Sequence, residues 1–246
     1  MASRRRSLGG TIVMPNSIVA DGAVETIERP AEAGPIAAEA FYLESRFPYE
    51  AFKRAIDVIA ALVGLILTLP LLIVIAVLVR LDSRGPILIR QPRLGKDARP
   101  FGMLKFRSMY ENGGDIPPEL LKDNESSGPL FKMKRDPRIT RVGRFLRRAS
   151  LDELPQLWNV LVGEMSLVGP RPPLARELAG YDTVQRLRLR VVPGLTGLWQ
   201  VSGRSDLVFD EMVQLDLRYI EERSLWLDLT ILLRTVPCVL TGRGAY

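Results

Sequence analysis

Two adjacent acidic residues, Asp152 and Glu153, are the part of the sequence best suited to catalysis. A strongly basic stretch precedes them, and a Pro-Arg-Pro turn centred on Arg171 follows. A carboxylate can act as a nucleophile, and arginine binds phosphate oxygens in a bidentate manner. Residues 150–172 therefore predict chemistry on a phosphate group.

The composition restricts which catalytic groups the chain can use. Its 246 residues carry a net charge of +6 and give a pI near 9.7, so an anionic partner is expected. There is no histidine, and Cys238 is the single cysteine. This excludes His-based triads, intrachain disulfides and cysteine zinc clusters. A general base must be a carboxylate, lysine, tyrosine or water, and oxygen ligands favour Mg²⁺ or Mn²⁺ as any metal.

The chain divides into a tail and a folded part. Residues 1–45 are predicted to be a disordered polar tail, because residues 29–40 are poor in bulky apolar side chains. The arginines at positions 4–6 are not followed by the apolar run of a secretory signal.

An apolar run at residues 55–79 is the candidate membrane segment, and Asp57 is its one charge. A helix of this length reaches about 37 Å, enough to cross a hydrocarbon core of about 30 Å. Pro70 interrupts the run and removes a helix hydrogen bond. The flanking charges are too even to decide between a kinked spanning helix and a helix that returns to the same face. The length disfavours a buried soluble helix.

The remaining sequence mixes extended and helical patterns. Residues 86–110 are predicted to be extended, with Lys105 and Arg107 on one face of a strand. Residues 111–130 indicate a loop, residues 174–190 a helix, and residues 193–204 a glycine-rich turn region without phosphate-loop spacing. The stretch at 226–237 fits an interfacial helix with Trp226 at the headgroup level, or almost equally a buried core helix.

Two motifs have simpler interpretations. Ser150 and Glu153 have the spacing of a helix capping box, but a cap alone does not need the basic stretch before it. Helix N-termini also bind phosphate, so Asp152 is expected to attack a phosphoryl group bound there. Residues 131–148 hold eight basic residues and one acid. They could form a solvated face, but anionic lipid and substrate phosphate are the better partners. The chain has no recognised nucleic-acid motif, so we expect no nucleic-acid partner.

A resemblance to a known family rests on ordered motifs between about residues 50 and 240. These motifs are Lys53-Arg54, Asp57, Pro70, Gln91, Arg93, Gly95, the segments at 105–109, 136–144 and 150–156, Gly169-Pro-Arg-Pro172, Arg204, Asp216, Tyr219, Trp226, Asp228 and Thr235. Together they resemble the monotopic polyprenyl-phosphate phosphoglycosyl transferases. These bacterial sugar transferases start the assembly of exopolysaccharides and glycoconjugates.

The resemblance implies an α+β, predominantly helical fold of the short, single-anchor form. Residues 46–80 would be a re-entrant helix, broken at Pro70, in the cytoplasmic leaflet of the inner membrane. Family members often have serine before this proline, whereas this chain has Leu69, which offers the bend no polar group. Residues 81–246 would be a cytoplasmic catalytic domain with a short β element and interfacial amphipathic helices.

The resemblance also implies a reaction between a UDP-sugar and undecaprenyl phosphate, in which UMP is released. Asp152 would form a covalent phosphosugar intermediate, Glu153 would complete the dyad, and both would hold Mg²⁺. The implied substrate-binding residues are Lys105, Arg107, Arg147, Gln156, Arg171 and Arg204.

Several partners and competing functions stay open at this stage. Anionic phospholipid is an expected partner, and a homodimer is an open option. The sugar is undetermined. A membrane-anchored basic adaptor without catalysis and a UDP-releasing glycosyltransferase are the competing functions. A glycosidase is disfavoured, because adjacent carboxylates cannot flank a sugar from opposite sides.

Overall fold

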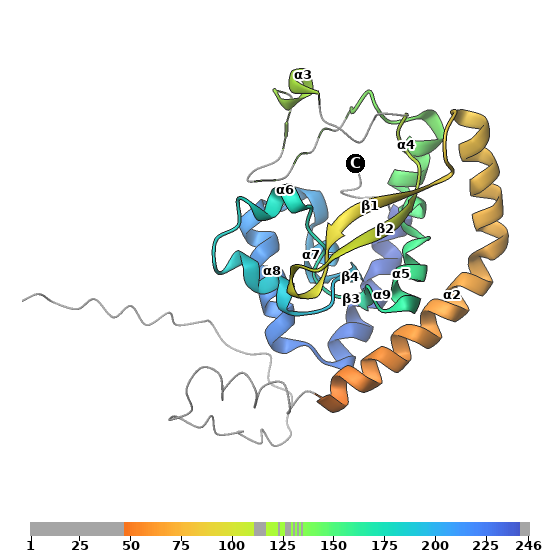
Figure 1. Ribbon diagram of the computed structural model, residues 1–246. Coiled ribbons are helices and arrows are strands. Elements are labelled where there is room, and N and C mark those ends of the chain that lie inside the picture. Colours follow the sequence, from red (N-terminus) through yellow and green to blue (C-terminus); the bar gives the residue numbers. More distant parts are fainter. Residues whose placement is uncertain are drawn as a thin grey trace, which may run out of the picture. The chain divides into compact units, whose positions relative to one another are not determined.

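The computed structural model describes residues 47–110, 117–122, 124–125, 129, 131, 133 and 135–241 (Figure 1). Contacts separate Met1–Glu44 from Ser45–Tyr246, and the fold below belongs to the second unit. The tail predicted at residues 1–45 lies outside the described residues, as do Lys132 and Lys134 of the basic stretch.

The long helix α2 (Phe47–Asp82) contains the whole predicted membrane run. Within the described residues it is the one helix long and apolar enough to cross a membrane. The predicted break at Pro70 is wrong, because α2 continues through this proline and curves instead (Figure 1). Packing on both sides of the proline holds the helix together. Ala61 joins the main core before it, whereas Ile75 and Val79 pack in a second cluster after it. Whether the helix is re-entrant stays a prediction.

A β-hairpin follows α2, as the extended pattern predicts. Strand β1 (Leu88–Leu94) pairs antiparallel with β2 (Pro100–Phe106), and the short 3₁₀ turn η1 (Lys96–Ala98) joins them. The register places Lys105 opposite Ile89. Arg107 lies one residue beyond β2, and its N–H still donates to the Ile87 carbonyl at 2.9 Å.

Short helices follow the hairpin. They are α3 (Pro118–Leu121), α4 (Arg141–Arg148), the 3₁₀ turn η2 (Leu151–Glu153) and α5 (Gln156–Val162). Among them, α4 and α5 pack against α2. Helix α4 begins at a cap that the sequence analysis missed, since the Thr140 hydroxyl accepts a hydrogen bond from the Gly143 N–H at 2.9 Å. In α5, Asn159 accepts from the Leu104 N–H at 2.9 Å and donates to the Gly102 carbonyl at 2.9 Å. This side chain therefore fixes β2 to α5.

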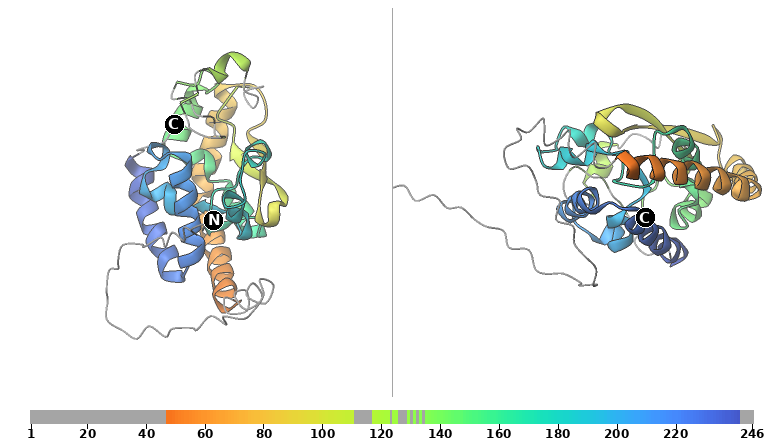
Figure 2. Two further views of the ribbon diagram at one scale, coloured as in Figure 1. Left: turned by 90° about the vertical axis from the view of Figure 1, so that its left-hand side faces the viewer. Right: turned by 90° about the horizontal axis from the view of Figure 1, so that it is seen from below.

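The C-terminal half differs from the predicted pattern. Strand β3 (Ser166–Val168) pairs parallel with β4 (Gly194–Thr196). The helix predicted at 174–190 is instead α6 (Ala175–Leu178) and the 3₁₀ helix η3 (Gln185–Arg190). The predicted turn region at 193–204 contains β4 and α7 (Leu198–Ser202). The turn η4 (Arg204–Asp206) and helices α8 (Phe209–Glu222) and α9 (Leu225–Thr241) follow. Figure 2 shows α8 and α9 on one side of the domain, with α2 running past them.

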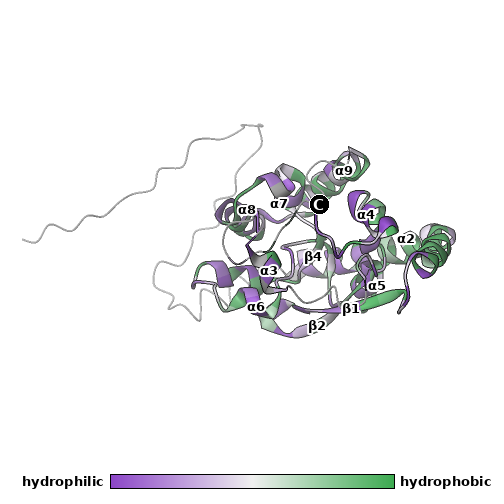
Figure 3. Ribbon diagram, turned by 90° about the horizontal axis from the view of Figure 1, so that it is seen from above, coloured by the Kyte–Doolittle hydropathy of each residue, from purple (hydrophilic) through white to green (hydrophobic). Residues whose placement is uncertain are grey.

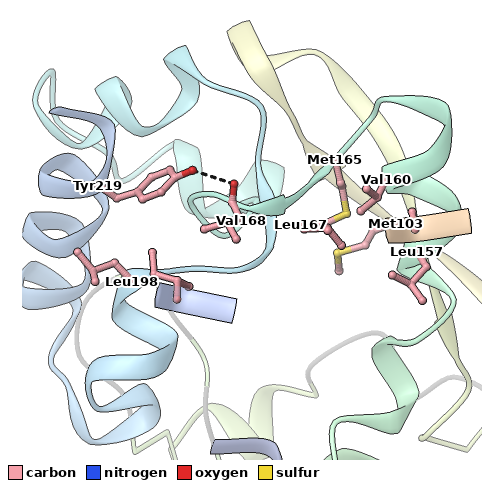
Figure 4. Close-up of a cluster of buried hydrophobic side chains, with 10 residues drawn as sticks. Met103, Leu157, Val160, Met165, Leu167, Val168, Leu198 and Tyr219 are labelled. Atoms are coloured by element: carbon pink, nitrogen blue, oxygen red, sulfur yellow. Dashed lines mark hydrogen bonds between the residues drawn. The ribbon is translucent and has the colours of Figure 1, made fainter. Parts of the chain in front are cut away.

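One main core joins α2, the two small sheets and helices α5, α7, α8 and α9. Figure 4 shows its buried side chains, including Met103, Leu157 and Met165. The Tyr219 hydroxyl reaches the Val168 carbonyl oxygen at 3.0 Å and also Asp228 at 2.8 Å. These elements confirm the predicted predominantly helical α+β class.

A buried carboxylate on α9 ties the two ends of the fold together. Besides Tyr219, Asp228 accepts hydrogen bonds from Lys53 at 2.8 Å and from Tyr49 at 3.0 Å. Lys53 and Tyr49 belong to the first turns of α2. The start of the apolar helix is therefore anchored on the C-terminal helices.

The face of α9 turned away from the core is apolar and exposed. Its members recur at helical spacing: Trp226, Leu229, Leu233, Val236 and Leu240. Phe145 of α4 and Trp158 of α5 are also exposed, and Figure 3 shows α2 and α9 as largely hydrophobic helices. Because Trp226 is 76% exposed, the buried-core alternative does not describe this face. It fits the predicted interfacial helix.

Candidate active site

The acidic pair lies on a tight turn rather than on a helix. Ser150 has a left-handed backbone (φ 54°) and makes no side-chain cap, and Asp152 and Glu153 follow in η2. The predicted capping box is wrong, because the Glu153 carboxylate reaches Lys105 instead of the Ser150 backbone. The next α-helix, α5, begins only at Gln156. The dyad is thus held by a turn with a left-handed first residue and by Lys105 of β2, not by a helix N-terminus.

The two carboxylates have different surroundings. Glu153 lies 2.7 Å from the Lys105 ammonium and 3.8 Å from the Arg171 guanidinium. Asp152 is 5% exposed. Its side chain makes no ion pair or hydrogen bond to another residue of the described part of the chain. Glu153 is thus paired with Lys105 and Arg171, whereas the Asp152 carboxylate is left available to a ligand.

The electrostatic environment separates the pair further. Burial raises the pKa of the Asp152 carboxyl; Lys105 opposes this shift, and the charge of Glu153 adds to it. Burial also acts to raise the pKa of Glu153, but Lys105 and Arg171 outweigh it, so this pKa lies below its ordinary value. Glu153 is therefore the firmly ionised member, and Asp152 is the more basic carboxylate.

The dyad opens into a cleft of about 1050 Å³. Of the sequence-predicted site residues, the structure brings seven to its lining: Lys105, Arg107, Arg147, Asp152, Glu153, Arg171 and Arg204. The lining also contains Arg93 and Arg176, which the site prediction did not include. A strongly cationic cleft around an unpaired carboxylate can bind a polyanion and present a nucleophile to it.

The carbonyl groups of the Pro-Arg-Pro turn are held by hydrogen bonds from two sides. From β1, Arg93 donates to the Pro172 carbonyl and the Leu94 N–H donates to the Pro173 carbonyl, both at 3.0 Å. From β4, the Gly194 N–H donates to the Pro170 carbonyl at 2.9 Å. These bonds position Arg171, which keeps 37% of its side chain exposed.

Two predicted substrate-binding residues have other surroundings. The Arg107 guanidinium donates to the Pro86 and Ser83 carbonyls, both at 2.6 Å, and to the Val79 carbonyl at 3.2 Å. These bonds cap the C-terminal end of α2, so the geometry gives a structural reason for this arginine. Gln156 is buried at the start of α5 and does not line the cleft. Substrate contacts by these two residues stay predictions.

A buried ion pair beside the cleft also escaped the sequence analysis. Arg188 lies 2.6 Å from Asp216, and both side chains are almost fully buried. Tyr181 accepts a further hydrogen bond from Arg188 at 2.9 Å, and burial raises the pKa of Asp216 to about 6 despite the arginine. The partners are 28 residues apart in the chain, and no local pattern links them.

The donor set for a metal is small. Within the part of the chain that the structure describes, no three acidic or cysteine side chains converge on one point. Asp152 and Glu153 are adjacent oxygen donors, but Lys105 already occupies Glu153. Mg²⁺ is commonly held by one or two carboxylates together with substrate phosphates. The residues present therefore fit a magnesium ion that is shared with a bound diphosphate.

Comparison with known proteins identifies the chain's relatives. It is 46% identical over 194 residues to the galactosyl transferase CpsE of Streptococcus agalactiae, covering 78% of this chain and 43% of CpsE. It is 44% identical over 198 residues to the exopolysaccharide production protein ExoY of Rhizobium meliloti, covering 79% and 88%. It is 43% identical over 204 residues to the UDP-glucose:undecaprenyl-phosphate glucose-1-phosphate transferase of Caulobacter vibrioides, covering 79% and 72%.

The chain thus spans less than half of CpsE but most of ExoY. A family profile described as bacterial sugar transferase matches residues 48–242, which include the dyad, the cationic cleft and α2. The chain belongs to the bacterial sugar transferase family.

Proposed function

We propose that this chain transfers a sugar-1-phosphate from a UDP-sugar to undecaprenyl phosphate and releases UMP. The observation that carries the proposal is the buried Asp152 carboxylate, which pairs with no residue of the described part of the chain and lies beside Glu153 in a cationic cleft. The names of relatives give the same substrate classes, since the Caulobacter protein is called a UDP-glucose:undecaprenyl-phosphate glucose-1-phosphate transferase.

The reaction divides into two displacements at one phosphorus atom. An Asp152 oxygen attacks the β-phosphorus of the UDP-sugar, the bond to the bridging oxygen breaks, and UMP leaves. A phosphate oxygen of the lipid then attacks the same phosphorus, and the Asp152–phosphorus bond breaks to restore the carboxylate. Each displacement exchanges one oxygen for another, so neither needs a histidine base.

The surrounding cations offset the negative charge of the donor. Arg147 and Arg171 line the cleft together with the dyad, and they would bind the phosphate oxygens before and during the attack. Lys105 remains paired with Glu153. The pair keeps this second carboxylate ionised while the ammonium balances its charge. A bound Mg²⁺, held by Asp152 and Glu153 with the diphosphate, would supply Lewis-acid stabilisation of the leaving group.

The exposed apolar surfaces support a location at a membrane, which we propose to be the inner membrane at its cytoplasmic face. Helix α2 would enter one leaflet or cross the whole bilayer. The apolar face of α9 would lie in the interface beside anionic phospholipid. The polyprenyl phosphate has its phosphate in the headgroup plane, and the UDP-sugar comes from the aqueous side. A site between these regions can reach both substrates.

The released nucleotide tests the proposal. Protein in nanodiscs is given undecaprenyl phosphate, Mg²⁺ and a panel of UDP-sugars, and the nucleotide is identified. Lipid-dependent UMP is expected, and the active donor identifies the sugar. Release of UDP would instead indicate an ordinary glycosyltransferase, and no nucleotide from any donor would favour a membrane-anchored adaptor.

The nucleophile is tested with a matched pair of amide substitutions. Asp152→Asn is expected to abolish UMP release, because the amide cannot form the acyl-phosphate link. Asp210→Asn changes an exposed carboxylate on α8 outside the cleft and should retain activity. Turnover by folded Asp152→Asn protein would rule out the covalent mechanism.

A further inference from the structure

The active-site cleft has a second, apolar wall. Its members come from β4, α7 and α9, away from the dyad in the chain, and we call them the α9 groove: Leu195, Trp199, Leu232, Cys238 and Val239. The diphosphate and the sugar of a nucleoside diphosphate sugar are polar, so these parts of the donor do not match the apolar wall.

The α9 groove is continuous with the exposed face of the same helix. The cleft-lining residues Leu232 and Val239 are each followed by an exposed apolar residue, Leu233 and Leu240. Neighbouring helix positions are 100° apart, because an α-helix has 3.6 residues per turn. The apolar surface therefore turns around α9 from the interior of the cleft to the outside of the domain.

A partly buried pair of hydrogen bonds holds this wall in place. The Thr235 hydroxyl donates to the Ile231 carbonyl at 2.8 Å, and Thr235 and Thr196 lie 2.8 Å apart. Thr235 already donates its only hydroxyl proton to Ile231, so Thr196 is the donor in the hydrogen bond between the two threonines. The bond fixes the middle of α9 to β4. The groove therefore belongs to the folded scaffold.

We propose that the α9 groove binds the first isoprene units of the polyprenyl phosphate acceptor and leads its phosphate to Asp152. This inference rests on the proposed function. The occupant follows from the chemistry of the cleft, which is cationic at Arg147 and Arg171 and apolar at α9. A linear hydrocarbon with one phosphate end matches both regions at once. The exposed face of α9 gives the hydrocarbon a continuous apolar path toward the bilayer.

A bulky side chain in the groove separates the two half-reactions. Cys238→Trp should lower formation of the lipid product by at least about tenfold and raise the KM for undecaprenyl phosphate. The first displacement does not use the groove, so one equivalent of UMP per enzyme should still appear without acceptor. The control is Gln214→Trp, an exposed site on α8 outside the cleft, which should leave both steps unchanged.

The unaltered protein provides an independent measurement. Cys238 is the only cysteine in the sequence and is partly accessible, so a maleimide reports on the groove alone. Undecaprenyl phosphate added to phosphatidylglycerol nanodiscs should slow this labelling several-fold. UDP-sugar alone, or further phosphatidylglycerol, should not slow it.

The outcomes distinguish the groove from the function itself. Two results would overturn the proposal that the α9 groove binds the acceptor. One is normal lipid-product formation by Cys238→Trp, and the other is maleimide labelling that undecaprenyl phosphate does not slow. Loss of the UMP burst together with product in folded Cys238→Trp protein would also overturn it, because the groove would then serve the donor. Absence of any UMP from the unaltered protein would instead overturn the proposed function on which the groove rests.

Discussion

Removing the charge of Lys105 should move the acid limb of the pH–activity profile to higher pH. The Lys105 ammonium lies 2.7 Å from Glu153, and it also opposes the burial that raises the pKa of Asp152. At 2.7 Å, Coulomb attraction is about 1.5 kcal/mol at the dielectric constant of water and about 6 kcal/mol at an effective constant of about 20. About 1.4 kcal/mol corresponds to one pKa unit. Removal of the Lys105 charge should therefore raise the pKa of Glu153 by at least about one unit.

The direction of the shift in the acid limb follows from the proposal that the ionised form of Asp152 is the active one. Without the cation, the ionised forms of both carboxylates lose stabilisation, so both pKa values rise. A smaller fraction of Asp152 is then ionised at any acidic pH, and UMP release in Lys105→Met falls at higher pH than in the unaltered protein. Adding Glu153→Gln removes the neighbouring negative charge that raises the pKa of Asp152. The double variant should therefore shift back toward lower pH.

The assay is the pH dependence of kcat/KM for UMP release between about pH 5 and 9, where the acid limb reports an essential base of the free enzyme. Lys53→Met is the matched control, because Lys53 pairs with Asp228 at 2.8 Å outside the cleft. It should leave the acid limb in place. An unchanged acid limb in Lys105→Met, with only a lower plateau, would show that Lys105 acts on the substrate and not on the dyad.

Three further perturbations follow from the contacts. Arg188→Met leaves the Asp216 carboxylate buried without its cation, which should cost about 3–5 kcal/mol in thermal or denaturant unfolding; a double variant with Asp216→Leu should recover much of this loss, and failure to recover would contradict the ion-pair account. Gly143→Ala places a Cβ atom against the Ser108 carbonyl oxygen and should destabilise the fold by about 1–3 kcal/mol, whereas Gly102→Ala, with its nearest contact at 3.5 Å, should change the melting temperature little. Chelation of divalent cations should stop UMP release, and added Mg²⁺ should restore it; full activity in excess chelator would remove the metal from the mechanism.

Periodicity in the sequence was sufficient for the long apolar helix, the hairpin and the last helix. The apolar run of α2, the alternating hairpin and the amphipathic pattern of α9 each depend on neighbours within a few residues. The acidic pair was also predictable, because two carboxylates between a basic stretch and a Pro-Arg-Pro turn are distinctive in composition. Local spacing was misleading at Ser150, where a long-range ion pair with Lys105 takes the glutamate away from the expected cap.

Long-range partners were beyond the sequence. Asp228 accepts hydrogen bonds from Lys53, which is 175 residues away in the chain, and from Tyr49, which is 179 residues away. No local pattern links these residues. The helix predicted at 174–190 fails for a related reason, since Arg188 turns inward to Asp216 and leaves a 3₁₀ segment at Gln185–Arg190. In both cases a buried charge found its partner through tertiary packing.

The different surroundings of the dyad explain why two adjacent carboxylates need not compete for one role. Glu153 pairs with Lys105 and lies near Arg171, and Lys105 acts on the charge of Asp152 without being bound to it. If Glu153 were apolar, Lys105 would be free to pair with Asp152 directly, and in the proposed mechanism Asp152 would have to break an ion pair before each attack. In that mechanism, Glu153 works by pairing with the lysine. Its negative charge also raises the pKa of Asp152, which would make the proposed nucleophile stronger while the nearby cations limit the cost of keeping it ionised.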